Sequence, residues 1–216
     1  MTSNCQTRVA SPAEHPSANF VSCSAPVNLG FLTVLHEPNG FFGGYLATNS
    51  WGRPLEFRLS TAVQPSRVQQ ILYGPTLRPY ICADLIGKTL VERTAICVQI
   101  VVTDCRSVLE LRRLIETPLV WLAVPADRSS PSLTLSGPET PGLNGVDLSL
   151  DSAIADSPAT SLSAGDVFCH PQFATDKPLV RGLIERLTET LDLAEPFGRI
   201  REAIGEARKM GVTKCA

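Results

Sequence analysis

The sequence of 216 residues lacks the cysteine and apolar patterns that would place a protein outside the reducing cytoplasm. Its 7 cysteines are odd in number and include no C-x-x-C pair, which argues against both a disulfide framework and a zinc knuckle. No apolar run approaches the ~20 residues of a bilayer span, and the first residues lack the apolar core of a signal peptide. We therefore expect a cytoplasmic protein with free thiols, no metal site and no membrane partner.

An excess of charge of either sign is also missing. Lys and Arg total 19 and Asp and Glu total 21, so the formal net charge is -2. Nucleic acids and anionic membranes attract strongly basic proteins, so the overall balance gives no reason to expect either partner. Hydrophobic residues make up 44% of the chain, which is enough for one domain with a buried core.

The most informative segment that is present covers residues 95–124. Its first part, 96–102, is a nearly continuous β-branched apolar run, typical of a strand covered on both faces. Ser107 and Glu110 have the spacing of a capping box at the start of a short helix, and a second apolar run follows at 119–124. Strand, helix and strand in this order predict a parallel βαβ unit in the middle of a sheet.

Short strands and helices are predicted on both sides of this unit. Residues 31–35, 45–48 and 55–60 have the patterns of three strands in a β-meander, and strict alternation in the third places Leu55, Phe57 and Leu59 on its buried face. Ser66 is expected to cap a short helix through Val68, Ile71 and Leu72. After the unit, the patterns predict a strand at 166–169 and two helices with apolar stripes.

Composition divides the chain into four parts. We expect a disordered arm at 1–27, a mixed α/β core at 28–125, a disordered Ser-, Pro- and Gly-rich linker or insertion at 126–165, and a strand plus helical hairpin packed on the core at 166–216. The predicted fold class is α+β: an antiparallel β-meander, then a helix and a βαβ unit, then a C-terminal helical hairpin after the long linker.

Two acids suggest a site at the carboxyl edge of the sheet. Asp104 directly follows the strand at 96–102, and Asp127 follows the next strand. Ligands of parallel α/β sheets bind beyond the carboxyl ends of strands, where two carboxylates hold Mg²⁺ or act as a base. No Gly-rich phosphate loop accompanies them, so the alternative is that Asp104 ends a strand and Asp127 begins a solvated linker.

Cys169 and His170 are the second candidate site. A thiol beside an imidazole suggests a cysteine nucleophile or a metal ligand. Neighbours on a strand point to opposite faces, however, so the two side chains do not pair with each other directly. The alternative is a buried cysteine at a strand end followed by a surface histidine.

Gly-flanked and turn aromatics are candidates for binding. Phe41 and Phe42 would be presented to a partner by a flexible loop or, alternatively, would begin the second strand and pack inward. Trp51 and Arg53 lie in a turn, and with the basic stretch 53–93 they suggest contact with single-stranded nucleic acid or, alternatively, a solvated face of mixed charge.

The last helix carries an apolar stripe that needs a cover. Phe197, Ile200 and Ile204 would pack either on the chain's own sheet or on another subunit. The long linker before this helix makes the second arrangement credible, because a flexible tether lets a module reach a separate surface.

No convergent set of catalytic residue types occurs at a known spacing, and nothing indicates a cofactor. We therefore expect a non-catalytic intracellular accessory or adaptor subunit that acts through contacts with another protein subunit. One alternative is an enzyme with an acidic site at Asp104 and Asp127, with Cys169 or His170 as further candidates. The other is binding of single-stranded nucleic acid through Trp51 and the basic stretch.

Overall fold

The computed structural model describes residues 27–123, 160–162, 165–187 and 191–211. Nearly all of the expected N-terminal arm and most of the expected linker, including Asp127, lie outside these ranges. The linker prediction needs one correction, because a short strand at Thr160–Leu162 falls within it.

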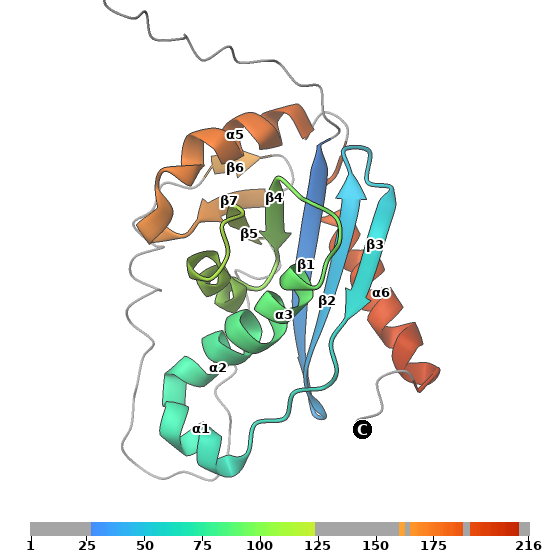
Figure 1. The fold of residues 1–216 in the computed structure, drawn as a ribbon, viewed down its shortest axis with the longest axis vertical. Helices are drawn as coiled ribbons and strands as arrows, with labels where there is room; N and C mark the ends of the chain where they lie inside the picture. Colours follow the sequence, from blue (N-terminus) through green and yellow to red (C-terminus); the bar gives the residue numbers. More distant parts are fainter. Residues whose placement is uncertain (1–26, 124–159, 163–164, 188–190, 212–216) are drawn as a thin grey trace, which may run out of the picture.

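Seven strands form a single mixed sheet in the order β3-β2-β1-β4-β5-β7-β6 (Figure 1). The strands are β1 (Asn28–Glu37), β2 (Gly40–Asn49), β3 (Pro54–Leu59), β4 (Ile100–Thr103), β5 (Leu119–Ala123), β6 (Thr160–Leu162) and β7 (Gly165–Cys169). The first three form the expected antiparallel meander, and β7 pairs antiparallel with β5. The fold class is α+β, as the sequence predicts.

The predicted βαβ unit is confirmed at the centre of this sheet. Strand β4 lies parallel to both β1 and β5. Strand β4 is shorter than expected, because residues 96–99 are not strand. Its pairing with β1 starts only at Ile100, and β1 begins just one residue before the position that pairs with Ile100. The connecting helix is the 3₁₀ helix η3 (Arg106–Arg113), and Cys105 is its N-cap, so the expected capping box at Ser107 is wrong.

The predicted alternation of the third strand is also wrong. Leu55 and Phe57 are 45% and 40% exposed, whereas the Glu56 side chain is only 17% exposed. Glu56 accepts hydrogen bonds from Arg58 and from the backbone N–H of Ala95. The physical reason is that β3 is the edge strand, where the segment after the helices covers the polar face at Glu56, whereas only Leu59 on the apolar face packs against the core.

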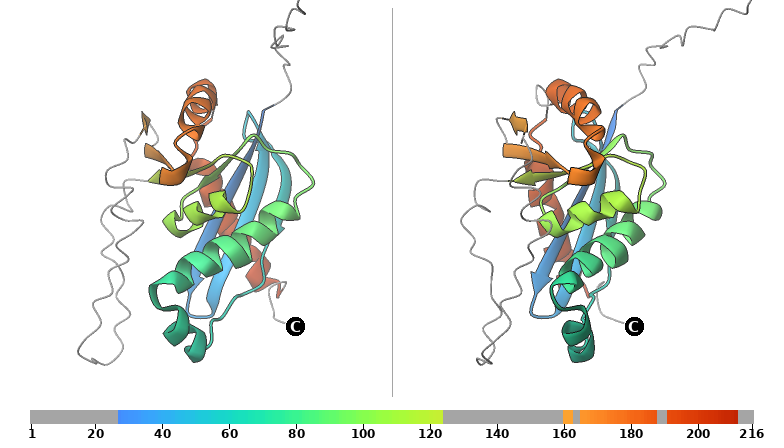
Figure 2. Two further views of the ribbon diagram at one scale, coloured as in Figure 1. Left: turned by 60° about the vertical axis from the view of Figure 1, so that its left-hand side comes forward. Right: turned by 90° about the vertical axis from the view of Figure 1, so that its left-hand side faces the viewer.

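Helices cover both faces of the sheet (Figures 1 and 2). One face packs against the two C-terminal helices, α5 (Asp176–Leu187) and α6 (Glu195–Lys209). The other packs against η3 and against α2 (Leu77–Pro79), η2 (Tyr80–Gly87) and α3 (Lys88–Glu92). These three form one continuous helical run with α1 (Arg67–Tyr73) and η1 (Gly74–Thr76), which contribute no residue to the core. Within this run, η2 is a π-helix.

The pair Gly43–Gly44 in β2 lets both helical layers approach the sheet closely. A Cβ at Gly43 would overlap Ile86 of η2, and a Cβ at Gly44 would overlap Ile200 of α6 on the opposite face. Alternating side-chain directions along a strand place the two contacts on different faces. The two glycines therefore allow helices to pack closely on both faces of β2.

Candidate functional site

Asp104 lies at the carboxyl end of β4, as predicted, and its carboxylate is paired with a cation of the same chain. Its side chain is 4% exposed and forms an ion pair and hydrogen bond with Arg201 of α6. The two residues join β4 to the last helix at the edge where an α/β sheet would bind a ligand. In the part of the chain that the structure describes, no three His, Cys, Asp or Glu residues are grouped so as to hold a metal ion.

Cys169 and His170 lie in different surroundings, and His170 is buried rather than at the surface. Cys169 faces the core beneath α5 and α6, and burial, reinforced by the charge of Asp176, raises the pKa of its thiol to about 11. His170 is 3% exposed, and its Nδ1 accepts a hydrogen bond of 3.2 Å from the backbone N–H of Gln172. A proton on the neutral ring is thereby placed on Nε2, which lies 3.7 Å from Glu110 Oε1. Burial lowers the pKa of His170 despite that carboxylate.

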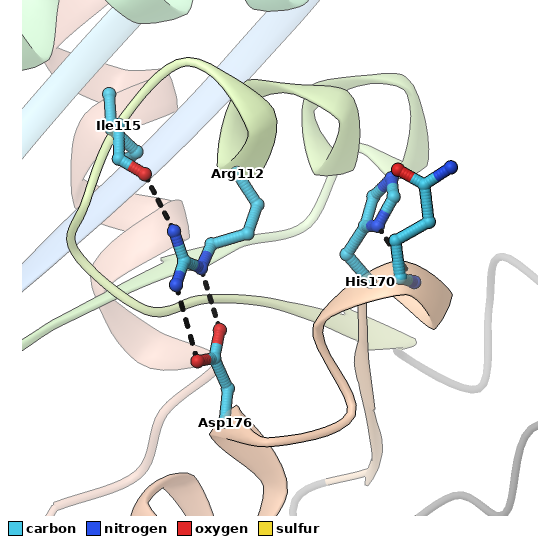
Figure 3. Close-up of polar contacts among 5 residues, drawn as sticks. Arg112, Ile115, His170 and Asp176 are labelled. Carbon is cyan, nitrogen blue, oxygen red and sulfur yellow. Dashed lines mark hydrogen bonds and ion pairs between the residues drawn. The ribbon is translucent and has the colours of Figure 1, made fainter.

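A polar junction next to His170 attaches the C-terminal segment to the βαβ unit (Figure 3). Arg112 of η3 donates through Nε and Nη2 to the two carboxylate oxygens of Asp176, at 2.6 and 3.2 Å, and through Nη1 to the carbonyl of Ile115. Its guanidinium also lies over the ring of Phe173, 4.3 Å from the centroid. Such a bidentate pair fixes geometry more firmly than a single contact, so the junction positions the start of α5.

Five of the apolar residues predicted to bind a partner belong to the core. Phe42 is buried in β2, so the expected flexible loop is wrong and the alternative of a strand that packs inward is right. Phe197, Ile200 and Ile204 are buried against the chain's own sheet, which settles their two alternatives in favour of internal packing. Phe41 is likewise buried, and its ring stacks on His36.

Trp51 is exposed, in a turn whose shape is fixed by Asn49. The Asn49 side chain accepts hydrogen bonds from the backbone N–H groups of Trp51 and Arg53, and Gly52 between them has a φ of +72°. The indole is 70% exposed. The turn therefore holds an aromatic ring in solvent shortly before the edge strand, in which Leu55 and Phe57 are also exposed.

Within the described ranges, one exposed apolar surface was not among the sequence-based candidates. Helix α1 has no buried residue, and Val68, Ile71 and Leu72 are 63%, 67% and 76% exposed. We call these three residues the α1 face. The expected cap at Ser66 is confirmed, and it is a capping box with reciprocal hydrogen bonds between Ser66 and Gln69. The sequence predicted the helix and its apolar spacing, but spacing alone does not distinguish a core-facing stripe from an exposed one.

Two cysteines far apart in the sequence lie in one apolar cluster of the fold. Cys82 of η2 lies in an apolar cluster against which Cys105, the N-cap of η3, is packed. Their sequence separation matches no redox or metal motif. Only the topology, which packs η2 against η3, identifies the pair.

A comparison with protein-family models and with curated proteins finds no match for this chain. Among the helices of the described ranges, none has the length and apolar character needed to cross a membrane.

Proposed function

We propose that this protein is a non-catalytic intracellular accessory subunit that binds a partner protein through the α1 face. The observation that carries this proposal is the exposure of three large aliphatic side chains on one short helix with no buried residue. Contiguous apolar surface of this kind marks interaction sites in soluble proteins. The residues with catalytic potential support an enzyme less well, because Asp104 is paired with Arg201 and Cys169 faces the core.

The length of α1 strengthens this argument. A helix of seven residues is marginal in water, and helices in proteins gain most of their stability by packing an apolar face. In α1 that face is turned away from the sheet, and the helix lies at the lower end of the molecule in Figure 1, beyond the strands. A partner that covers Val68, Ile71 and Leu72 would supply the missing packing.

Charge around the α1 face indicates the chemistry of the partner. Residues 61–83 contain Arg67 and Arg78 and no Asp or Glu. A second copy of the chain would bring these arginines together, which electrostatics disfavours. We therefore expect a different protein whose apolar side chains are bordered by carboxylates, since complementary charge guides association and fixes orientation.

Photo-crosslinking tests this proposal in cells. A photoreactive amino acid replaces Ile71 in one variant and Leu179 in a control; Leu179 is also exposed, at 51%, but lies on α5. We expect a single protein cross-linked from position 71 and not from position 179. Equal products from both positions, a second copy of this chain, or nucleic acid as the main product would contradict the proposal.

The affinity of the purified partner for this protein then measures how much the α1 face contributes to binding. Replacing Ile71 and Leu72 together by Ser removes two apolar anchors, so we expect a loss of roughly 2 kcal/mol or more, about a 30-fold weaker Kd. The Leu179→Ser variant is the control and should bind like the wild type. Calorimetry that finds the same Kd for all three proteins would overturn the assignment of the α1 face.

A further inference from the structure

Strand β3 forms one edge of the sheet, and within the described ranges no further strand pairs with its outer side. The opposite edge strand, β6, has only three residues, which limits pairing with another chain, whereas β3 has six. The apolar face of β3 is open as well, because Leu55 and Phe57 are 45% and 40% exposed. A strand edge with exposed apolar side chains is a template for pairing with a strand of another chain.

The backbone of β3 directs hydrogen-bonding groups toward this open edge. Ser60 donates its N–H to the Gly43 carbonyl of β2, at 2.9 Å, and the backbone groups of successive residues in a strand point to opposite sides. The N–H and C=O groups of Phe57 and Leu59 therefore point away from β2. The register shift between β2 and β3 lies at the beginning of β3, so residues 56–59 keep this alternation.

The sequence of β3 is self-complementary when two copies pair antiparallel about Phe57. A twofold axis at this residue places Phe57 opposite Phe57 of the second copy, as a hydrogen-bonded pair that exchanges two N–H···O=C bonds. Each Glu56 then lies opposite Arg58 of the other copy. Each Leu55 likewise lies opposite Leu59. Aromatic, charged and apolar pairs of these kinds stabilise antiparallel sheets.

Charge selects this register. A twofold axis one residue earlier or later would place Glu56 opposite Glu56, or Arg58 opposite Arg58, and like charges directly opposite each other destabilise a sheet. Within one chain Arg58 already donates to Glu56, and its side chain remains 36% exposed. Pairing about Phe57 would place two such ion pairs side by side with alternating sign, and networks of charges contribute more than isolated surface pairs.

We propose that two copies of this protein associate through antiparallel pairing of their β3 edges, which joins their sheets into one continuous sheet. The interface is isologous, because each copy contributes the same strand. It is separate from the α1 face, since β3 forms the right-hand edge of the sheet in Figure 1 and α1 lies beyond the lower end of the strands. The dimer therefore does not depend on the partner proposed for α1.

Sedimentation equilibrium of the full chain over a range of concentrations tests for this dimer. Arg58→Glu places a second carboxylate opposite Glu56 of the other copy, so we expect the dissociation constant of the dimer to rise by about tenfold or more. Arg181→Glu is the matched control, because Arg181 is an exposed arginine of α5 that also pairs with a glutamate of its own chain. This control should dimerise like the wild type. A wild type that stays monomeric at every concentration, or the same dissociation constant for both variants, would overturn the proposal.

A disulfide between two copies tests the register, even if Arg58→Glu does not fold. The Cα atoms of a hydrogen-bonded antiparallel pair are about 5.5 Å apart, within the range that a disulfide spans. Under mild oxidation we therefore expect Phe57→Cys to form a dimer linked through position 57 of both copies, identified by mass spectrometry of the peptides. Leu179→Cys, at an exposed position of α5, is the control and should form no such link. Absence of the link at position 57, or equal linking at positions 57 and 179, would contradict the paired edge.

Discussion

His170 is a buried histidine with a fixed group at each ring nitrogen, and this makes it sensitive to acid. Nδ1 accepts the backbone N–H of Gln172, and Nε2 faces Glu110. Protonation would remove the acceptor at Nδ1 and place a charge in a site that is 3% exposed. Arg112 and Arg113 add to this cost, because their charges also disfavour the imidazolium.

The pKa of His170 is lower in the folded protein than in the unfolded chain. This direction fixes how the contribution of His170 to the free energy of unfolding changes with pH. Above the unfolded value of about 6.5 both states carry the neutral ring and its contribution to stability is complete. Below that value the unfolded chain binds a proton that the folded state resists, so the free energy of unfolding decreases as the pH falls through the folded pKa.

Replacing His170 by Asn should reduce this loss. The Asn carbonyl keeps an acceptor for the Gln172 N–H but does not titrate. We expect the free energy of unfolding of the wild type to fall more than that of His170→Asn between about pH 7.5 and pH 5.5 in urea titrations. His36→Asn, at an exposed position, is the control and should follow the wild type. Parallel curves for His170→Asn and the wild type would contradict the assignment.

At the scale of secondary-structure elements, the close contact between β2 and α6 depends on Gly44. A Cβ there would overlap Ile200 Cγ2 and lie 3.1 Å from Ile204 Cδ1. We expect Gly44→Ala to lower the free energy of unfolding by about 1–3 kcal/mol, because overpacking displaces the helix. Chemical denaturation measures this change.

Gly198 provides the matched control on α6. A Cβ at this position meets nothing within 4 Å, so Gly198→Ala should raise stability by about 0.4–1 kcal/mol through the unfolded chain and helix propensity. If Gly44→Ala were as stable as the wild type, the sheet and α6 would have to be packed less closely than described.

The sequence predicted most elements, and the errors share a physical cause. Local signals identified α1, whose capping box needs only Ser66 and Gln69, and the central parallel strands, whose apolar runs suit burial on both faces. The burial of Leu55 and Phe57 was predicted wrongly because it depends on which segment covers each face of an edge strand. The cap predicted at Ser107 is wrong because the preceding loop already ends at Cys105, which is the N-cap of η3.

At the scale of the whole molecule, the candidate sites depend on contacts between segments far apart in the chain. Asp104 was found from its position after a strand, but its pairing with Arg201, 97 residues later, requires the packing of α6 on the sheet. The placement of Cys82 and Cys105 in one apolar cluster likewise requires η2 to lie against η3. No periodicity or motif encodes such proximity, so these features follow only from the assembled fold.

The central claim is that α1 is the surface on which a partner protein docks. Hydrogen–deuterium exchange of the free protein and of its purified complex with the cross-linked partner measures this most directly. The account predicts rapid exchange of the α1 amides in the free protein, because the helix is short and fully exposed, and strong protection in the complex. Unchanged exchange of α1, with protection at Trp51 and β3 or at the carboxyl end of β4, would contradict it.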